Sequence, residues 1–217
     1  MEFATLNPQG FFFYSLYMTA GFIDPDIGSG TVMHFQDNNI CLQVEVNDLF
    51  FALHAFMISS IQLMQIFVYD NGSKQGKLVL WPVLLICGEW IFVLTLFFLE
   101  VCGVTLNENI QFLRGAGYCK ALITFVKYMP QVWLNYKRKS TEGWSITNII
   151  LDFTGGSFSI LQDVIKAVGH GTSPFAGNGF NIVKWMLGVM SIIFDSIFMV
   201  QHYVLYRHAT TPISEDK

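Results

Sequence analysis

The sequence predicts an all-α integral membrane protein made of packed helical bundles. Apolar residues make up 53% of its 217 residues and charged residues only 13%, whereas a soluble domain carries about a quarter charged residues. Six stretches are also apolar and long enough to cross a hydrocarbon core of roughly 30 Å, which takes about 20 helical residues. A chain of this composition has too little polar surface to coat a water-soluble particle, which favours a membrane bundle.

The six predicted membrane helices are distributed over the whole chain. They cover residues 4–23, 48–68, 80–102, 113–136, 145–168 and 180–206. The Pro8-Gln9 pair lies inside the first of them. Each stretch is bounded by a polar connection, so the pattern predicts alternating crossings of the bilayer.

The connections alternate in basic charge. Lysine and arginine occur in 69–79, in the hinge 137–144 and in the tail, whereas 24–47, 103–112 and 169–179 have neither. Basic connections face the cytosol in membrane proteins. The alternation therefore predicts that both termini and the basic hinge are cytosolic, and that the acidic 24–47 connection lies on the opposite side.

The fourth and fifth segments carry polar residues at depths where lipid disfavours them. Lys127, Gln131 and Asn135 recur at i, i+4 and i+8, and Asn148 and Asp152 at i and i+4, so each set shares a helix face. A carboxylate in the membrane costs several kcal/mol unless it faces protein or water. We therefore expect these faces to hold something polar. The alternatives are that Asp152 only neutralises Lys127, and that the two asparagines only bond backbone groups across helices.

Proline and glycine add two local features. Pro130 cannot donate a backbone hydrogen bond inside its segment, so Pro130 and Gln131 are predicted to form a hinge. Gly155 and Gly156 are predicted to let two helices approach closely, because neither has a side chain.

Three further acidic residues lie in predicted helices. Asp163 and Lys166, at i and i+3, are expected to form an ion pair at a helix end. Glu89 and Glu100 lie 11 residues apart and therefore on one helix face, with Glu100 at the membrane boundary.

Several motifs together resemble those of the cystinosin family of PQ-loop transporters. They are Pro130-Gln131, the run KSTEGWSI at 139–146, the run DFTGGS at 152–157, NDLFFALHA at 47–55, and Phe194-Asp195 followed by Gln201-His202. The resemblance extends over nearly the whole chain. It implies two three-helix bundles that are parallel repeats, as in SWEET sugar facilitators, joined by a linker helix.

The resemblance also implies a division of the chain. Residues 1–79 correspond to the remainder of the first bundle, 80–112 to the linker helix and its loop, 113–206 to the second bundle with the PQ-loop, and 207–217 to a cytosolic tail. The family has seven helices, and six are expected here, with the first helix and the first PQ motif missing.

The family's functional residues carry over to matching positions. The resemblance implies proton-coupling roles for Asp152, Asp48 and Asp195, and substrate-binding roles for Lys127, Asn135, Asn148, Asn7 and Tyr14. For Asp48, capping of the following helix is an alternative.

The implied function is transport without chemistry on the substrate. The resemblance implies proton-coupled export of L-cystine from the lumen of a lysosome or vacuole to the cytosol, with cystine, protons and membrane lipid as partners. No enzymatic activity, cofactor, metal or nucleic acid is expected. The alternatives are transport of a cationic amino acid or a sugar, and a truncated membrane partner that does not transport.

Overall fold

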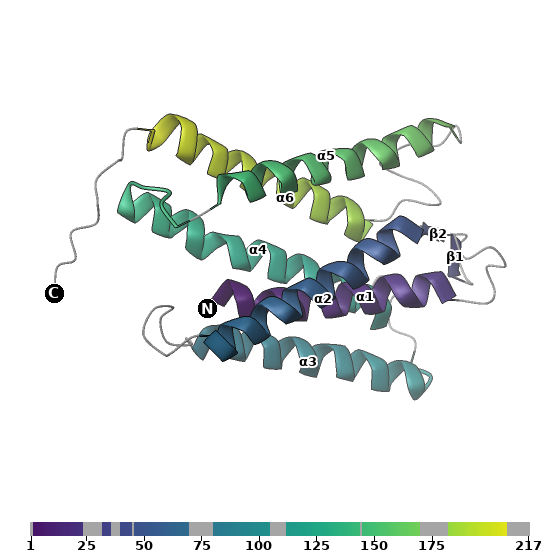
Figure 1. Cartoon of the computed structure of the whole chain (residues 1–217). Coiled ribbons are helices and arrows are strands. Elements are labelled where there is room, and N and C mark those ends of the chain that lie inside the picture. Colours follow the sequence, from purple (N-terminus) through teal and green to yellow (C-terminus); the bar gives the residue numbers. More distant parts are fainter. Residues whose placement is uncertain are drawn as a thin grey trace.

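Six α-helices form the body of the protein, as the sequence predicts. The computed structural model describes residues 2–23, 32–35, 40–44, 46–69, 80–104, 112–143, 145–169 and 182–207. Within these residues the helices are α1 (Glu2–Ile23), α2 (Val46–Tyr69), α3 (Leu80–Val101), α4 (Phe112–Arg138), α5 (Ile146–Gly169) and α6 (Ile182–Val200), and a π-helical turn, η3 (Gln201–Leu205), continues α6 (Figure 1). All six predicted segments are confirmed, and their ends agree within one helical turn.

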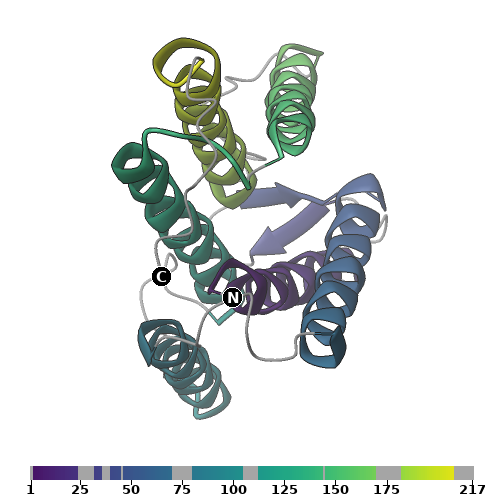
Figure 2. The same cartoon turned by 60° about the vertical axis from the view of Figure 1, so that its left-hand side comes forward.

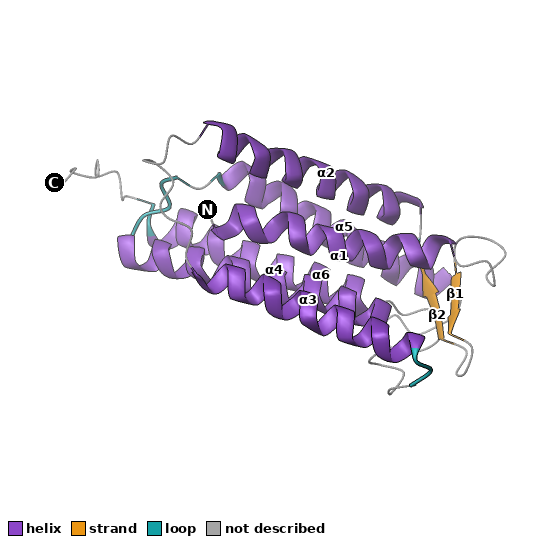
Figure 3. Cartoon of the chain, turned by 90° about the horizontal axis from the view of Figure 1, so that it is seen from below, coloured by secondary structure: helices purple, strands orange, loops and turns teal. Residues whose placement is uncertain are grey.

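Among the described residues, a short β-hairpin departs from the predicted all-α fold. Strands β1 (Val32–Phe35) and β2 (Ile40–Gln43) pair antiparallel, with Val32 opposite Gln43 and Phe35 opposite Ile40. The hairpin lies at one end of the helices, between α1 and α2 in sequence (Figure 3). The acidic residues of this connection, which is predicted to lie opposite the cytosol, are outside the described residues; they are Asp24, Asp26, Asp37 and Glu45.

The outer helix faces are suited to lipid. Large apolar side chains such as Phe50, Met64, Leu84 and Phe98 are exposed, which water would disfavour over so wide a surface. The stretches Val46–Tyr69, Leu80–Val101 and Val183–Leu205 are long and apolar enough to cross a membrane by length and composition alone. Helices α1, α4 and α5 have 22, 27 and 24 residues, and each contributes residues to the cavity described below.

The helices pack in two groups that share α4. Helix α1 packs against α2 and α4, α6 packs against α4 and α5, and α3 lies outside against α4 and α1 (Figures 1 and 2). One apolar core surrounds Tyr17 and Met18 of α1, and a second surrounds Tyr128 and Phe198, where α4 meets α6. Helices α2 and α5 are separated in space, with α5 above α2 in Figure 2.

One glycine allows α5 and α6 to pack closely. A Cβ atom on Gly156 would lie 3.3 Å from Ser191 Cβ and 3.4 Å from the Gly188 carbonyl oxygen, whereas a Cβ on Gly155 would meet nothing within 4 Å. The predicted close packing is therefore confirmed for Gly156 and wrong for Gly155, because only Gly156 faces the neighbouring helix.

Replacing these neighbouring glycines should separate their roles. Gly156→Leu forces a side chain between α5 and α6 and should destabilise the protein by about 1–3 kcal/mol. Gly155→Leu enters open space and serves as the matched control. Thermal unfolding of both variants in detergent, followed by size-exclusion chromatography, measures the difference. Equal midpoints would contradict the close approach at Gly156.

Candidate functional site

Five helices contribute to a cavity of about 420 Å³. Residues of α2 and α5, which lie apart, face it together with residues of α1, α4 and α6. Its walls include five charged side chains, which are Asp48, Lys120, Lys127, Asp152 and Lys184. Mixed charges of this kind suit a small solute that is itself charged.

A larger open groove, of about 1160 Å³, has a different character. It runs along α4 and α6 and is lined almost entirely by apolar side chains. Met129, Trp133 and Ile193 line it and are also exposed, so this face meets acyl chains when the protein is in a bilayer. The smaller polar cavity is therefore the candidate site.

The first charged group in the cavity centres on Asp152. The Tyr128 hydroxyl donates a hydrogen bond of 2.9 Å to Asp152 Oδ2, and Ser191 Oγ lies 3.5 Å from the same oxygen. The Lys127 ammonium donates to Asn7 Oδ1 at 3.1 Å, and the negative charge of Asp152 also acts on it. One carboxylate and one ammonium thus lie close together on α5 and α4.

A second lysine extends this group. The Lys120 side chain is 97% buried, and its ammonium lies 3.4 Å from the centre of the Phe11 ring. A cation over an aromatic face is stabilised by the negative charge on the face of the ring. The cavity wall of α4 therefore presents two cations, Lys120 and Lys127, on the same helix face.

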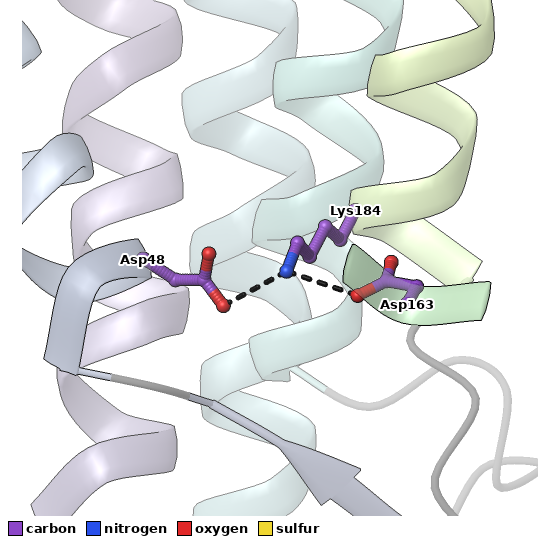
Figure 4. A network of polar contacts seen from close by, with 3 residues as sticks. All are labelled: Asp48, Asp163 and Lys184. Atoms are coloured by element: carbon purple, nitrogen blue, oxygen red, sulfur yellow. Dashed lines mark hydrogen bonds and ion pairs between the residues drawn. The ribbon is translucent and has the colours of Figure 1, made fainter. Parts of the chain in front are cut away.

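The second charged group joins three helices at one end of the cavity. Lys184 Nζ of α6 lies 3.1 Å from Asp48 Oδ2 of α2 and 3.0 Å from Asp163 Oδ1 of α5 (Figure 4). The Lys184 side chain is only 5% exposed. One buried ammonium therefore bridges two carboxylates, from α2 and from α5.

Comparison with known proteins identifies the family. Residues 112–167 match the PQ loop repeat family. The chain is 34% identical to a cystinosin homolog of Dictyostelium discoideum over 209 residues, which are 95% of this chain and 70% of that protein. The chain belongs to the cystinosin family. This cystinosin-family chain is also 36% identical to cystinosin of Bos taurus over 206 residues, 95% of this chain and 54% of the bovine protein.

A more distant relative bears a functional name. The cystine transporter of Saccharomyces cerevisiae is 25% identical over 229 residues, 95% of this chain and 81% of the yeast protein. The chain spans about half the length of the bovine cystinosin that it matches. The resemblance predicted from the motifs is confirmed, and this cystinosin-family chain is a multi-pass membrane protein.

Several predicted site residues meet in the cavity. Asp152, Asp48, Lys127 and Tyr14 line it, and Asn7 contacts it through its bond to Lys127. Asp48 lies within the first turn of α2, and its carboxylate bonds to Lys184. It is therefore not the residue that precedes and caps the helix.

Three other predicted residues lie outside the cavity lining. Asn135 is 1% exposed and donates to Gln201 Oε1 at 3.0 Å, while Gln131 donates to it at 2.8 Å. Asn148 is exposed on α5. Asp195 is fully buried, and neither of its carboxylate oxygens has a hydrogen-bond partner among the described residues. These Asn135 bonds join side chains, not the backbone groups of the alternative, and the substrate-binding role of Asn135 stays a prediction.

The predicted hinge lies within a continuous helix. Pro130 is inside α4, which runs from Phe112 to Arg138. Two residues further along α4, the Val132 carbonyl oxygen accepts a hydrogen bond of 3.1 Å from the Gln201 side chain of η3. The hinge role of Pro130 and Gln131 stays a prediction, and Gln201 provides a bond between α4 and the end of α6.

Sequence reasoning missed three residues of the site: Lys120, Tyr128 and Lys184. Lys120 lies seven residues before Lys127, so helical spacing could have indicated it. Lys184 pairs with Asp163, for which a local partner, Lys166, was predicted; the Lys166 side chain lies outside the described residues. Pairing across helices leaves no signal in residue spacing.

Removing the shared cation should destabilise the protein more than removing one of its partners. Lys184→Met leaves Asp48 and Asp163 without their ammonium and should lower the free energy of unfolding by up to about 3 kcal/mol. This is the lower end of the range for a broken buried ion pair, because Asp163 is partly exposed. Asp163→Asn, the matched control, leaves the Asp48 pair intact and should cost less. Thermal unfolding in detergent compares them. A larger loss for Asp163→Asn would contradict the shared role.

Proposed function

We propose that this chain forms the pathway for proton-coupled export of L-cystine from the lumen of a lysosome or vacuole to the cytosol. The observation that carries this proposal is a cavity with two charged groups at different heights along the helices: Lys127 with Asp152, and Lys184 with Asp48 and Asp163. Membership of the cystinosin family, and the name of the yeast cystine transporter, support the same substrate.

The cavity chemistry matches a solute with two zwitterionic ends. Cystine carries an ammonium and a carboxylate at each end. The first charged group offers Lys127 and Asp152, and the second offers Lys184 with Asp48 and Asp163. Asn7 bonds to the first group, and the charges of the second act on Tyr14. These two residues are two turns apart on α1, about 10 Å along the helix axis, so each group can receive one end of an extended molecule.

The placement of the charges supports the proposed direction of transport. The second group lies near the beginnings of α2 and α6, the end that the alternation of basic connections assigns to the lumen, with the C-terminus in the cytosol. Because Lys184 ties α2 to α5 and α6 there, its ion pairs must separate when the cavity opens to that side. A solute that carries both an ammonium and a carboxylate can then form new ion pairs with Lys184, Asp48 and Asp163.

Asp152 is the proposed carrier of the proton. Binding a proton removes the negative charge that acts on Lys127, and it changes the hydrogen bond from Tyr128, which now points at a neutral acid. Both changes weaken the attachment of α5 to α4 and favour movement. Each pH unit across the membrane supplies about 1.4 kcal/mol per proton. Asp48 and Asp195 are proposed as further protonation sites.

The two predicted asparagine ligands require a different conformation. Asn135 is engaged with Gln131 and Gln201, and Asn148 is exposed on α5. For either to bind cystine, α4 and α5 must shift relative to each other, and Pro130 is the proposed hinge for that shift. The bonds of Asn135 would then break as part of the transport cycle.

Uptake of labelled cystine into proteoliposomes tests the proposal. The unmodified chain should take up cystine faster when the side corresponding to the lumen is acidified, because a proton travels with the substrate. Asp152→Asn should lose this pH stimulation, since its amide does not titrate. Ser191→Ala, which removes only the weaker contact at 3.5 Å, is the control and should keep it. Equal stimulation in Asp152→Asn would remove Asp152 from the mechanism, and absence of uptake by the folded chain would favour a non-transporting partner.

Competition distinguishes the substrate classes. Unlabelled cystine should inhibit uptake more strongly than lysine or glucose, because only cystine offers a zwitterion to each charged group. Losing one buried charged contact costs about 1.5–3 kcal/mol, so lysine should bind at least tenfold more weakly. Inhibition constants from the same liposomes measure this. Equal inhibition by lysine would indicate a cationic amino-acid transporter instead.

A further inference from the structure

Helix α3 contains a buried acidic residue that the proposed transport mechanism does not use. Glu89 lies in the middle of α3 and is 4% exposed. It does not line the cavity. Val93 and Leu96, one and two turns further on, are the neighbouring buried residues of this helix, so Glu89 belongs to the face that packs inward.

Apolar residues from three helices pack one turn beyond Glu89. Val93 clusters with Phe13 of α1 and with Ala116 and Cys119 of α4. Trp90, next to Glu89, packs on Phe13 with ring centres 5.3 Å apart. Glu89 therefore lies where α3 is covered by α1 and α4.

No hydrogen bond in the described part of the chain compensates the Glu89 carboxylate. Both of its oxygens are buried and have no hydrogen-bond partner there. The titratable group of α4 on which its charge acts is the Cys119 thiol, which is not a cation. The next basic residue along α4, Lys120, places its ammonium over Phe11 instead, and α1 has no charged residue after Glu2.

Burial without a partner determines which form of this side chain is stable. An ionised carboxylate in such a site costs several kcal/mol, whereas a neutral acid loses only its hydrogen bonds with water. We propose that Glu89 is a proton-binding site separate from the cavity: it holds a proton while α3 packs on α1 and α4, and releases the proton when these helices separate and water reaches it. Proton binding at Glu89 does not depend on which solute the cavity carries.

Infrared spectroscopy of the full chain in lipid tests this proposal. A protonated carboxyl group has a carbonyl stretch distinct from that of a carboxylate. At neutral pH, Glu89→Gln should lose one carboxylic-acid band relative to the unmodified chain. Glu100→Gln is the matched control on the same helix, because Glu100 is exposed and accepts a hydrogen bond of 3.2 Å from the Phe112 amide. It should leave the acid bands unchanged.

An unchanged spectrum of folded Glu89→Gln would overturn the proposal. Should that variant not fold, the unmodified chain can be treated with N,N′-dicyclohexylcarbodiimide, which requires a protonated acid. The acid proton moves to a carbodiimide nitrogen, the carboxyl oxygen bonds to the central carbon, and the acyl group then migrates to nitrogen as a stable N-acylurea. A label on Glu89, located by mass spectrometry, supports the site, and its absence from Glu89 overturns it. Neither result depends on whether the chain still transports cystine.

Discussion

A single buried ammonium connects the two sides of the cavity. Helix α2 packs mainly on α1, and α5 packs mainly on α6. Helices α2 and α5 therefore have few direct contacts with each other. Lys184 bonds to Asp48 of α2 and Asp163 of α5 at about the same distance, 3.1 and 3.0 Å. Because unpaired charges are costly inside a bundle, this bridge holds α2, α5 and α6 together at that end of the cavity.

Four of the acidic side chains in this bundle occur in three environments. Asp152 accepts a hydrogen bond from Tyr128 and faces the cavity, and Asp48 forms an ion pair. Asp195 and Glu89 are buried, and the residues described here offer their oxygens no hydrogen bond. The first environment suits the reversible protonation proposed for Asp152, and the second suits the ion pairs proposed to separate when the cavity opens. The third suits a proton that is held until the packing changes.

Much of the architecture could be predicted because it depends on local composition. All six helical segments follow from apolar length, and the family follows from motifs at fixed spacing. The hairpin β1–β2 was missed, although Leu42 and Val44 alternate with Gln43 and Glu45 around its second strand. Of the predicted site residues, Asp152, Lys127, Asp48 and Tyr14 meet in the cavity. Asn135 shares a helix face with Lys127, and its bonds to Gln131 and Gln201 engage it outside the cavity.

The sequence alone determined that this is a six-helix membrane bundle of the cystinosin family, with polar faces on its fourth and fifth helices. Hydrophobic length and helical period are properties of consecutive residues, so they can be read without a fold. Only the tertiary structure decided which charges meet: Lys184 with Asp48, which is 136 residues away, and Tyr128 with Asp152. It also decided that Gly156, and not Gly155, lies against α6. Contacts between helices depend on how each helix is rotated about its axis, and spacing within one helix does not specify that rotation relative to its neighbours.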